Sequence, residues 1–412
     1  MEVRPILSAL WRNKTGPVLI VLQIALTLGV VVNAVFLIDT RLDKMSLSLG
    51  IDSENIFSLS SILVTPVPNM YDFIRDDLDA IRAIPGVRSA TVMLTVPHSG
   101  SARADTYRGT DELNPDLERL ANVNFVDEHG LETLGAELIA GRNFRPEEIT
   151  YLAENEQARV EVVIVSESMG RKLFGEEKDI LGQTIYYGPN NEQIRVVGVI
   201  NDVATAWVAA DSEFGRNSLY NFMLQPFIET KTGRGHNYVI RSEPGMQGQV
   251  MAAVEATLFE RYPDRLVEQI RSHAEVVERS YATDRAITRI LSIVAGLMIA
   301  ITGLGIVGLA SFSVNQRQQQ IGTRRALGAK RRDIIRYFVL ENLLLTTAGM
   351  SLGCVLAWLF HQFLFGILPI PTLRLELLPM GAVILYLLGL VAVFGPALRA
   401  AAVPPAVASR AV

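Results

Sequence analysis

The sequence contains little cysteine and little histidine, and this scarcity limits the chemistry that it can carry. A single cysteine, Cys354, occurs in 412 residues, so no disulfide can form within the chain. The five histidines are scattered, and none belongs to an H-E-x-x-H motif or is grouped with cysteine. Structural and catalytic zinc sites need several such ligands at defined spacing. The sequence therefore predicts neither a metal site nor a disulfide framework.

Motifs for nucleotide binding and for hydrolysis are also missing. The 412 residues contain no G-x-x-x-x-G-K-[ST] loop, so they cannot bind ATP by that route. They contain no G-x-S-x-G sequence, the motif of the α/β-hydrolase nucleophile. The carboxylates are numerous, but a solvated acidic surface explains them better than paired acid–base catalysis. We therefore expect no catalytic residue, no cofactor bound by this chain, and an energy source in another subunit.

Long apolar runs are present and indicate a membrane protein with a large soluble insert. The mean hydropathy is +0.27, too high for one soluble domain and too low for a chain that lies entirely in the membrane. Four runs are long enough to cross about 30 Å of hydrocarbon. They are residues 17–38, 285–314, 337–366 and 377–398. We expect residues 1–16 to form an amphipathic helix on the membrane surface and residues 367–376 to form a short outer loop.

The first apolar run has an alternative interpretation as a signal peptide. Val32-Asn33-Ala34 would serve as a cleavage site, and the mature chain would then begin at Val35. The run is longer than the apolar core of about 7–15 residues that signal peptides carry. An uncleaved anchor is therefore expected.

The charges are distributed unequally along the chain. The overall net charge is −5, but residues 39–284 carry −16, whereas residues 1–16, 315–336 and 399–412 together carry +10. Lysine and arginine in short loops are retained on the cytoplasmic side of a membrane. We therefore expect both termini and residues 315–336 in the cytoplasm and residues 39–284 outside. The basic residues adjoin membrane spans and accompany no nucleic-acid-binding motif, so nucleic acid is not an expected partner.

Residues 39–284 have the pattern of a two-lobed α/β domain. A strand–helix–strand pattern occurs near each end, and two such units can pair into one small lobe made of residues 53–117 and 227–271. The expected elements are strands 56–63 and 87–94 around helix 71–84, and strands 238–241 and 265–270 around helix 247–262. Residues 118–226 between them are expected to form a β-rich lobe of short strands closed by glycines, for example at Leu134-Gly135 and Leu173-Phe174-Gly175.

A helical pattern then runs without a break from Ser272 to Val314 and includes the second apolar run. Glycines recur along its apolar part, and small residues at such spacing allow helices to approach closely. These glycines are Gly296, Gly303, Gly305 and Gly308.

The most distinctive stretch lies between the second and third apolar runs. Residues 315–342 read NQRQQQIGTRRALGAKRRDIIRYFVLEN and contain seven basic residues. Apolar residues such as Ile321, Leu327 and Ile334 recur at roughly helical spacing, interrupted by Gly322 and Gly328. A loop that only reversed the chain direction would need no apolar face. The pattern therefore indicates a segment that docks on a partner.

The run IGTRRALGAKRRDIIRYFVLEN resembles the signature that follows the second span of FtsX-like permeases, in particular those of MacB-type ATP-binding-cassette (ABC) transporters. In that family the segment forms a coupling helix that lies in a groove of a separate ATPase subunit. The ATPase-coupling positions that match are Ile321, Gly322, Arg325, Ala326, Leu327, Gly328, Ala329, Ile334 and Glu341. Gln320 departs from the pattern, because the family usually carries glutamate there. Glu341 is expected to pair with Arg336 or another basic residue of the segment.

The resemblance extends to the insert, whose two lobes are similar to the porter-like subdomain and the periplasmic core of the MacB-type family. It implies an α+β membrane protein of four transmembrane helices with a two-lobed α/β periplasmic domain between helices 1 and 2. The implied function is that of a permease subunit in the bacterial inner membrane. Such a subunit transmits ATPase motion to the periplasmic domain and drives efflux of a drug, peptide or similar substrate.

The implied partners are a cytoplasmic ATPase that binds ATP and Mg²⁺, a second permease chain, a periplasmic adaptor and an outer-membrane channel. The second permease chain could be identical or a sister chain. Two alternatives remain open: a permease that releases lipoproteins, and an FtsX-like scaffold that controls a cell-wall hydrolase. The length of the insert, residues 39–284, favours export over the scaffold.

Overall fold

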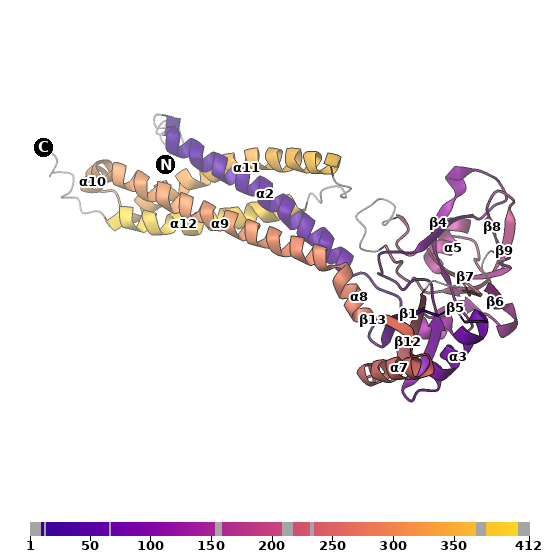
Figure 1. Cartoon of the computed structure of the whole chain (residues 1–412). Helices are drawn as coiled ribbons and strands as arrows, with labels where there is room; N and C mark the ends of the chain where they lie inside the picture. Colours follow the sequence, from indigo (N-terminus) through magenta and orange to yellow (C-terminus); the bar gives the residue numbers. More distant parts are fainter. Residues whose placement is uncertain are drawn as a thin grey trace. The chain divides into compact units, whose positions relative to one another are not determined.

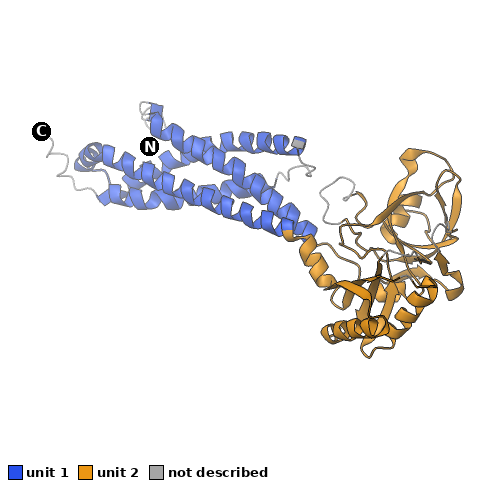
Figure 2. Ribbon diagram, viewed as in Figure 1, with its two compact units in different colours: residues 1–45, 283–412 blue, residues 46–282 orange. Residues whose placement is uncertain are grey.

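The computed structural model describes residues 10–11, 14–65, 67–152, 159–207, 217–230, 235–367 and 376–402. Most of the expected surface helix 1–16, of the outer loop 367–376 and of the tail 399–412 lies outside the described residues. The chain divides into two compact units (Figure 2). The helical unit contains Met1–Met45 and Thr283–Val412, and the α/β unit contains Ser46–Ala282.

Four long helices make up most of the helical unit (Figure 1). They are α2 (Thr15–Met45), α9 (Ala282–Gln316), α11 (Arg331–Ile367) and α12 (Leu377–Ala402), with the short helix α10 (Gln318–Ala326) between α9 and α11. Among the described residues, these four long helices have the length and composition of membrane spans. The predicted fold class is therefore confirmed: four apolar helices, with an α/β domain inserted between the first and the second.

Helices α2 and α11 pack closely because α11 lacks side chains where they meet. A Cβ atom on Gly349 would lie 2.8 Å from Cβ of Ile24, and one on Gly353 would lie 2.9 Å from Cβ of Leu28. Such distances leave no room for a side chain, so glycine at both positions permits the contact. The G-x-x-x-G spacing of Gly349 and Gly353 is the local signal for this contact, and these two glycines were not among those expected to bring helices together.

Helix α9 is joined to α2 by separate polar contacts. The Gln23 side chain donates a hydrogen bond to the backbone oxygen of Ile301 at 3.0 Å, and the hydroxyl oxygens of Thr27 and Thr302 lie 2.6 Å apart. In the most apolar 18-residue stretch of α9, only 17% is buried in the helical unit, whereas 56% of the corresponding stretch of α2 is buried. Helix α9 is therefore the most weakly packed of the four long helices.

The glycines of α9 differ in their surroundings. A Cβ atom on Gly303 would lie 3.3 Å from Leu388 of α12, and one on Gly305 would meet the Gln23 side chain. Gly296 and Gly308 have open space around them. The expected close approach of helices thus occurs at Gly303 and Gly305.

A four-stranded antiparallel sheet in the α/β unit combines the two ends of the insert. Its order is β13-β1-β12-β2, and helices α3 and α7 pack against it. The first half supplies β1 (Ile56–Leu63), α3 (Met70–Arg82) and β2 (Val87–Val92). The second half supplies β12 (His236–Ser242), α7 (Gln247–Arg261) and β13 (Arg265–Ser272). These bounds agree with the expected ones to within two residues.

A buried ion pair links the two halves of this lobe. Asp77 of α3 accepts hydrogen bonds from Arg265 of β13 at 2.9 and 3.0 Å and from the Tyr238 hydroxyl at 2.7 Å. The side chains of Asp77 and Arg265 are both 0% exposed. The guanidinium group of Arg265 also lies over the rings of Phe73 and Tyr262. Charge pairing and stacking together hold the two distant parts of the chain in one lobe.

The second lobe is built on a seven-stranded sheet of order β5-β9-β7-β10-β4-β3-β8, in which β8 also pairs with β9. The strands β9, β7, β10, β4, β3 and β8 therefore close into a ring, which leaves few free edges. The bounds are β3 (Arg103–Arg108), β4 (Arg119–Phe125), β5 (Leu138–Gly141), β7 (Val162–Ser166), β8 (Thr184–Tyr187), β9 (Glu192–Ile200) and β10 (Phe222–Gln225). A separate pair is formed by β6 (Thr150–Leu152) and β11 (Phe227–Glu229).

Three details differ from the sequence-based expectation. Strand β3 lies in the range 53–117 expected for the small lobe, yet it pairs with β4 and β8 of the larger sheet. Gly135 and Gly175 follow the helices α4 (Gly130–Leu134) and α5 (Glu167–Phe174), so they close helices instead of strands. Both have positive φ, +64° and +92°, a conformation that favours glycine.

The third difference concerns the helix expected from Ser272 to Val314, which is interrupted at Tyr281. Helix α8 (His273–Ser280) begins with a side-chain cap, in which the Ser272 hydroxyl accepts from the backbone N–H of Glu275. Tyr281 follows it with its side chain buried, and its hydroxyl lies 3.1 Å from Nε2 of His98. Packing of this tyrosine against His98 accompanies the break between α8 and α9.

Candidate coupling segment

The basic segment folds as a helix, a tight turn and the start of a second helix at one end of the helical unit (Figure 1). Helix α10 ends at Ala326, and Gly328 has a φ of +99° with open space around the position of a Cβ atom. At the start of α11, the Asp333 carboxylate accepts from the backbone N–H of Lys330 at 3.0 Å. This contact is half of a capping box. The glycine and the aspartate thus define where the turn begins and ends.

One part of the predicted coupling set is buried. Ile321 and Ile334 are 6% and 5% exposed, and both pack in the core of the helical unit. Gly322 is also buried. These residues position α10 against α11, so they support the turn and are not available to a partner.

Polar contacts attach the segment to the neighbouring helices. Arg317, at the end of α9, donates to a carboxylate oxygen of Glu341 at 3.1 Å and to the Tyr337 hydroxyl at 3.2 Å. Arg325 donates to the backbone oxygen of Ala401 in α12 at 3.1 Å. The expected pairing of Glu341 with Arg336 or another basic residue of the segment is confirmed, and Arg317 is the partner. The segment is connected to α9, α11 and α12 at once.

The other part of the predicted set faces outward. The side chain of Leu327 is 84% exposed, and Ala326 and Gly328 beside it are exposed as well. Ala329 and Arg325 are half-buried. The exposed basic residues around this turn are Arg324, Lys330, Arg331, Arg332 and Arg336. The arrangement is an apolar side chain surrounded by positive charge, which suits a partner surface with a small apolar pocket and an acidic rim.

Reasoning from the sequence did not assign Arg317 a specific partner, and it did not consider Asn342 at all. Arg317 lies 24 residues before Glu341, between α9 and α10, so no local spacing connects the two. Asn342 follows Glu341 directly and is 5% exposed. Its position as a polar residue within an apolar run was the feature of the sequence that could have identified Asn342.

Sequence comparison finds two families in the chain. The MacB-like periplasmic core domain matches residues 18–257, more than half of the chain. The FtsX-like permease C-terminal domain matches residues 292–405, which include the whole basic segment.

Curated relatives carry export names. The "Probable syringafactin export ATP-binding/permease protein SyfD" of Pseudomonas syringae pathovar tomato is 25% identical over 76% of this chain and 43% of its own length. The "Macrolide export ATP-binding/permease protein MacB" of Burkholderia thailandensis is 26% identical over 70% of this chain and 45% of its own length. The "Pyoverdine export ATP-binding/permease protein PvdT" of Pseudomonas syringae pathovar tomato is 27% identical over 52% of this chain and 32% of its own length. The chain thus spans less than half the length of these relatives.

Proposed function

Because the chain belongs to the family of the MacB-like periplasmic core domain and also carries an FtsX-like permease C-terminal domain, we propose that it is the permease subunit of an ABC export complex. It is a multi-pass membrane protein, and the proposed location is the bacterial inner membrane, with both termini and the turn at Leu327 in the cytoplasm. The proposed activity is the transmission of ATPase motion to a periplasmic domain.

Helix α9 is the element that carries this proposal. It runs for 35 residues without interruption, about 52 Å at 1.5 Å per residue, and begins where the sequence leaves the α/β unit. At its other end Arg317 ties it to Glu341 and Tyr337, next to the exposed turn. A helix of this length would be a stiff connection between the α/β unit and the exposed turn. Its limited packing against the other long helices leaves it able to shift as a rigid element.

The proposed partner is a cytoplasmic ATPase that binds ATP and Mg²⁺. Its closure would move the turn around Leu327, and the displacement would pass through α10 and the Arg317–Glu341 contact to α9. A second permease chain, identical or a sister, would complete the dimer on a pair of ATPases. On the periplasmic side, an adaptor and an outer-membrane channel would receive a drug, peptide or similar substrate. The relatives' names mention three different exported compounds, so they favour export in general and no particular cargo.

Substitution of Leu327 tests the docking step. Leu327→Asp places a negative charge in the proposed apolar contact, and Leu327→Met keeps the contact apolar at similar volume. Burial of a leucine side chain contributes about 1.5–3 kcal/mol, so its loss weakens binding by about 10- to 150-fold before the charge is counted. We expect Leu327→Asp to abolish co-purification of the chain with its ATPase and Leu327→Met to preserve it.

Membrane insertion and folding should be unchanged in both variants, because the Leu327 side chain is 84% exposed. The readouts are the amount of chain in the membrane fraction and the amount of ATPase recovered with it. Normal recovery of the ATPase with Leu327→Asp would refute the assignment of this turn as the docking site.

A further inference from the structure

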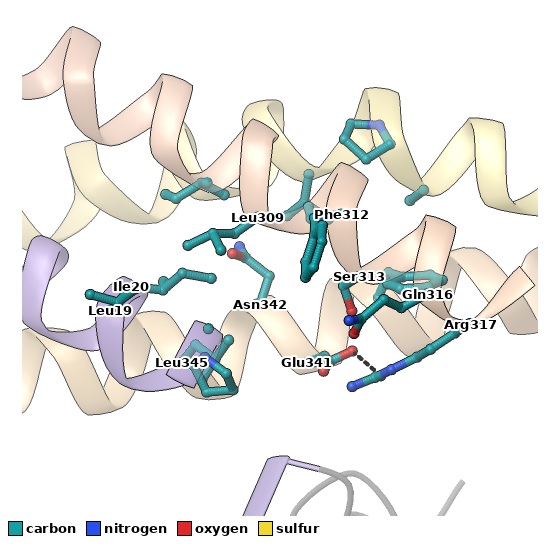
Figure 3. A pocket seen from close by; sticks show the side chains of 18 of the residues that line it. Leu19, Ile20, Leu309, Phe312, Ser313, Gln316, Arg317, Glu341, Asn342 and Leu345 are labelled. Carbon is teal, nitrogen blue, oxygen red and sulfur yellow. Dashed lines mark hydrogen bonds and ion pairs between the residues drawn. The ribbon is translucent and has the colours of Figure 1, made fainter. Parts of the chain in front are cut away.

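The helical unit contains a cavity of about 400 Å³ among α2, α9, α11 and α12 (Figure 3). Cavities that hold small molecules usually have volumes of about 300–1,000 Å³. Most of the wall is apolar. It includes Leu19 and Ile20 from α2, Leu309 and Phe312 from α9, and Leu345 from α11. The cavity is therefore large enough for a substantial apolar group, and it lies within the helices that have the properties of membrane spans.

One end of the cavity is polar. The Arg317–Glu341 ion pair lies there, close to Gln316 and Ser313 (Figure 3). Farther in, the side chain of Asn342 points from α11 into the cavity toward Leu309 of α9. The cavity thus has one polar end and one apolar end, like an amphipathic molecule.

Asn342 gives the second indication of a ligand. The residue is 5% exposed, and among the described residues no hydrogen-bond partner contacts its side chain. An amide buried without a partner costs free energy, and in a membrane no bulk water compensates for it. A ligand with a hydrogen-bond acceptor at this position would remove that cost.

The depth of Asn342 in the membrane points to the chemical nature of the acceptor. Asn342 is about ten residues from the middle of the expected span 337–366, which is about 14 Å along the helix. Half of the hydrocarbon layer is about 15 Å thick. Asn342 therefore lies near the boundary between hydrocarbon and headgroups, where the ester carbonyls of phospholipids are found.

The charged residues that line the cavity, Arg317 and Glu341, neutralise each other, but the basic segment that contains Arg317 favours an anionic lipid. Residues 315–336 contain seven basic residues and one acidic residue, and Arg331, Arg332 and Arg336 are exposed. Basic residues beside a membrane span attract anionic headgroups.

We propose that this cavity binds one acyl chain of an anionic phospholipid. The ester carbonyl accepts a hydrogen bond from the Asn342 amide, the chain lies against Leu309 and Leu345, and the phosphate faces the basic turn. The lipid fills the space between α9 and the other three long helices. This site goes beyond the proposed export function and does not depend on it.

Photolabelling of the full chain in lipid nanodiscs tests the site. The probe is phosphatidylglycerol with a photoactivatable group on one acyl chain, present at low mole fraction, and the labelled peptides are mapped by mass spectrometry. We expect the labels to concentrate on the part of α9 around Leu309 and the part of α11 around Asn342. The same probe built on zwitterionic phosphatidylethanolamine should label these peptides less.

Variants distinguish a filled cavity from general lipid contact. Leu309→Trp places a large side chain in the cavity, and we expect labelling to fall about ten-fold, which corresponds to about 1.4 kcal/mol of binding free energy. Leu304→Trp is the matched control on the same helix, because Leu304 is 73% exposed on the outer face. It should leave the labelling of the cavity peptides unchanged. Asn342→Leu removes the amide donor and keeps a side chain of similar size, so it should also lower the labelling of the cavity peptides. This variant tests the site even if Leu309→Trp does not fold.

The proposal is overturned if labels spread evenly over the exposed faces of α9 and α12, or if both Leu309→Trp and Asn342→Leu label like the unmodified chain. Equal labelling by the two headgroups would overturn the preference for an anionic lipid. A photoreactive amino acid at position 309 provides an independent measurement. Crosslinking from this position to a second copy of the chain, and not to lipid, would show that a protein covers the cavity and would overturn the lipid assignment.

Discussion

Loss of the Asp77 carboxylate should destabilise the small lobe of the α/β unit severely. Asp77→Ala removes the acceptor of two hydrogen bonds from Arg265 and of one from the Tyr238 hydroxyl. Arg265 then remains buried, with a side chain that is 0% exposed. Breaking a buried ion pair by removing one partner costs about 3–5 kcal/mol.

The expected shift in melting temperature follows from the size of the unit. For a domain of 150–250 residues, each kcal/mol changes the midpoint by about 2–4 °C, so we expect a decrease of about 6–20 °C. Asp79→Ala is the control on the same helix, since the side chain of Asp79 is 65% exposed and its contact with Arg82 is 3.9 Å long. Exposed ion pairs contribute about 0–1 kcal/mol, so this control should melt close to the unmodified chain.

Tryptophan fluorescence can follow the α/β unit alone. Trp207 is the sole tryptophan in residues 46–282, so replacing Trp11 and Trp358 with phenylalanine leaves one reporter in the full chain. The double variant Asp77→Leu with Arg265→Met should recover much of the loss, because apolar residues of similar volume can replace a buried ion pair. A change of less than about 1 kcal/mol for Asp77→Ala would refute the reasoning, because it would place the pair in the class of exposed ion pairs.

Two further predictions concern protonation and helix packing. Burial, and secondly the proximity of His273, lowers the pKa of His98 to about 4. The pKa of an unfolded histidine is about 6.5, so between these two pH values the unfolded chain binds more protons than the folded chain. The free energy of unfolding should therefore fall as the pH decreases from about 6.5 to 4. His98→Asn, which tolerates the φ of +64° at this position, should flatten that dependence in urea unfolding, and an unchanged slope would contradict it. Gly353→Ile should destabilise the helical unit by about 1–3 kcal/mol, because its side chain would meet Leu28, whereas Gly296→Ile has open space and should not. Labelling of Cys354 with a thiol-reactive dye during heating reports the unfolding of the helical unit in each variant. Equal midpoint temperatures for the two variants would contradict the predicted difference in stability.

The sequence alone determined the features that depend on local composition. The four membrane helices follow from runs of apolar residues longer than the bilayer is thick, and Thr15–Met45 and Leu377–Ala402 include the expected spans. The strand and helix ranges of the small lobe follow from period-two and helical spacing. Gly322 and Gly328 both interrupt the helical pattern in the sequence, but only Gly328 lies at a turn.

The tertiary structure decided what depends on contacts between distant residues. The pairing of β8 with β9, the ion pairs Asp77–Arg265 and Arg317–Glu341, and the unpartnered amide of Asn342 arise from residues that meet only after the chain has folded. Periodicity records which face of an element is buried, but it does not record what that face meets. For this reason the nine predicted coupling positions looked equivalent in the sequence. Folding separates them into a buried group around Ile321 and Ile334 and an exposed group around Leu327.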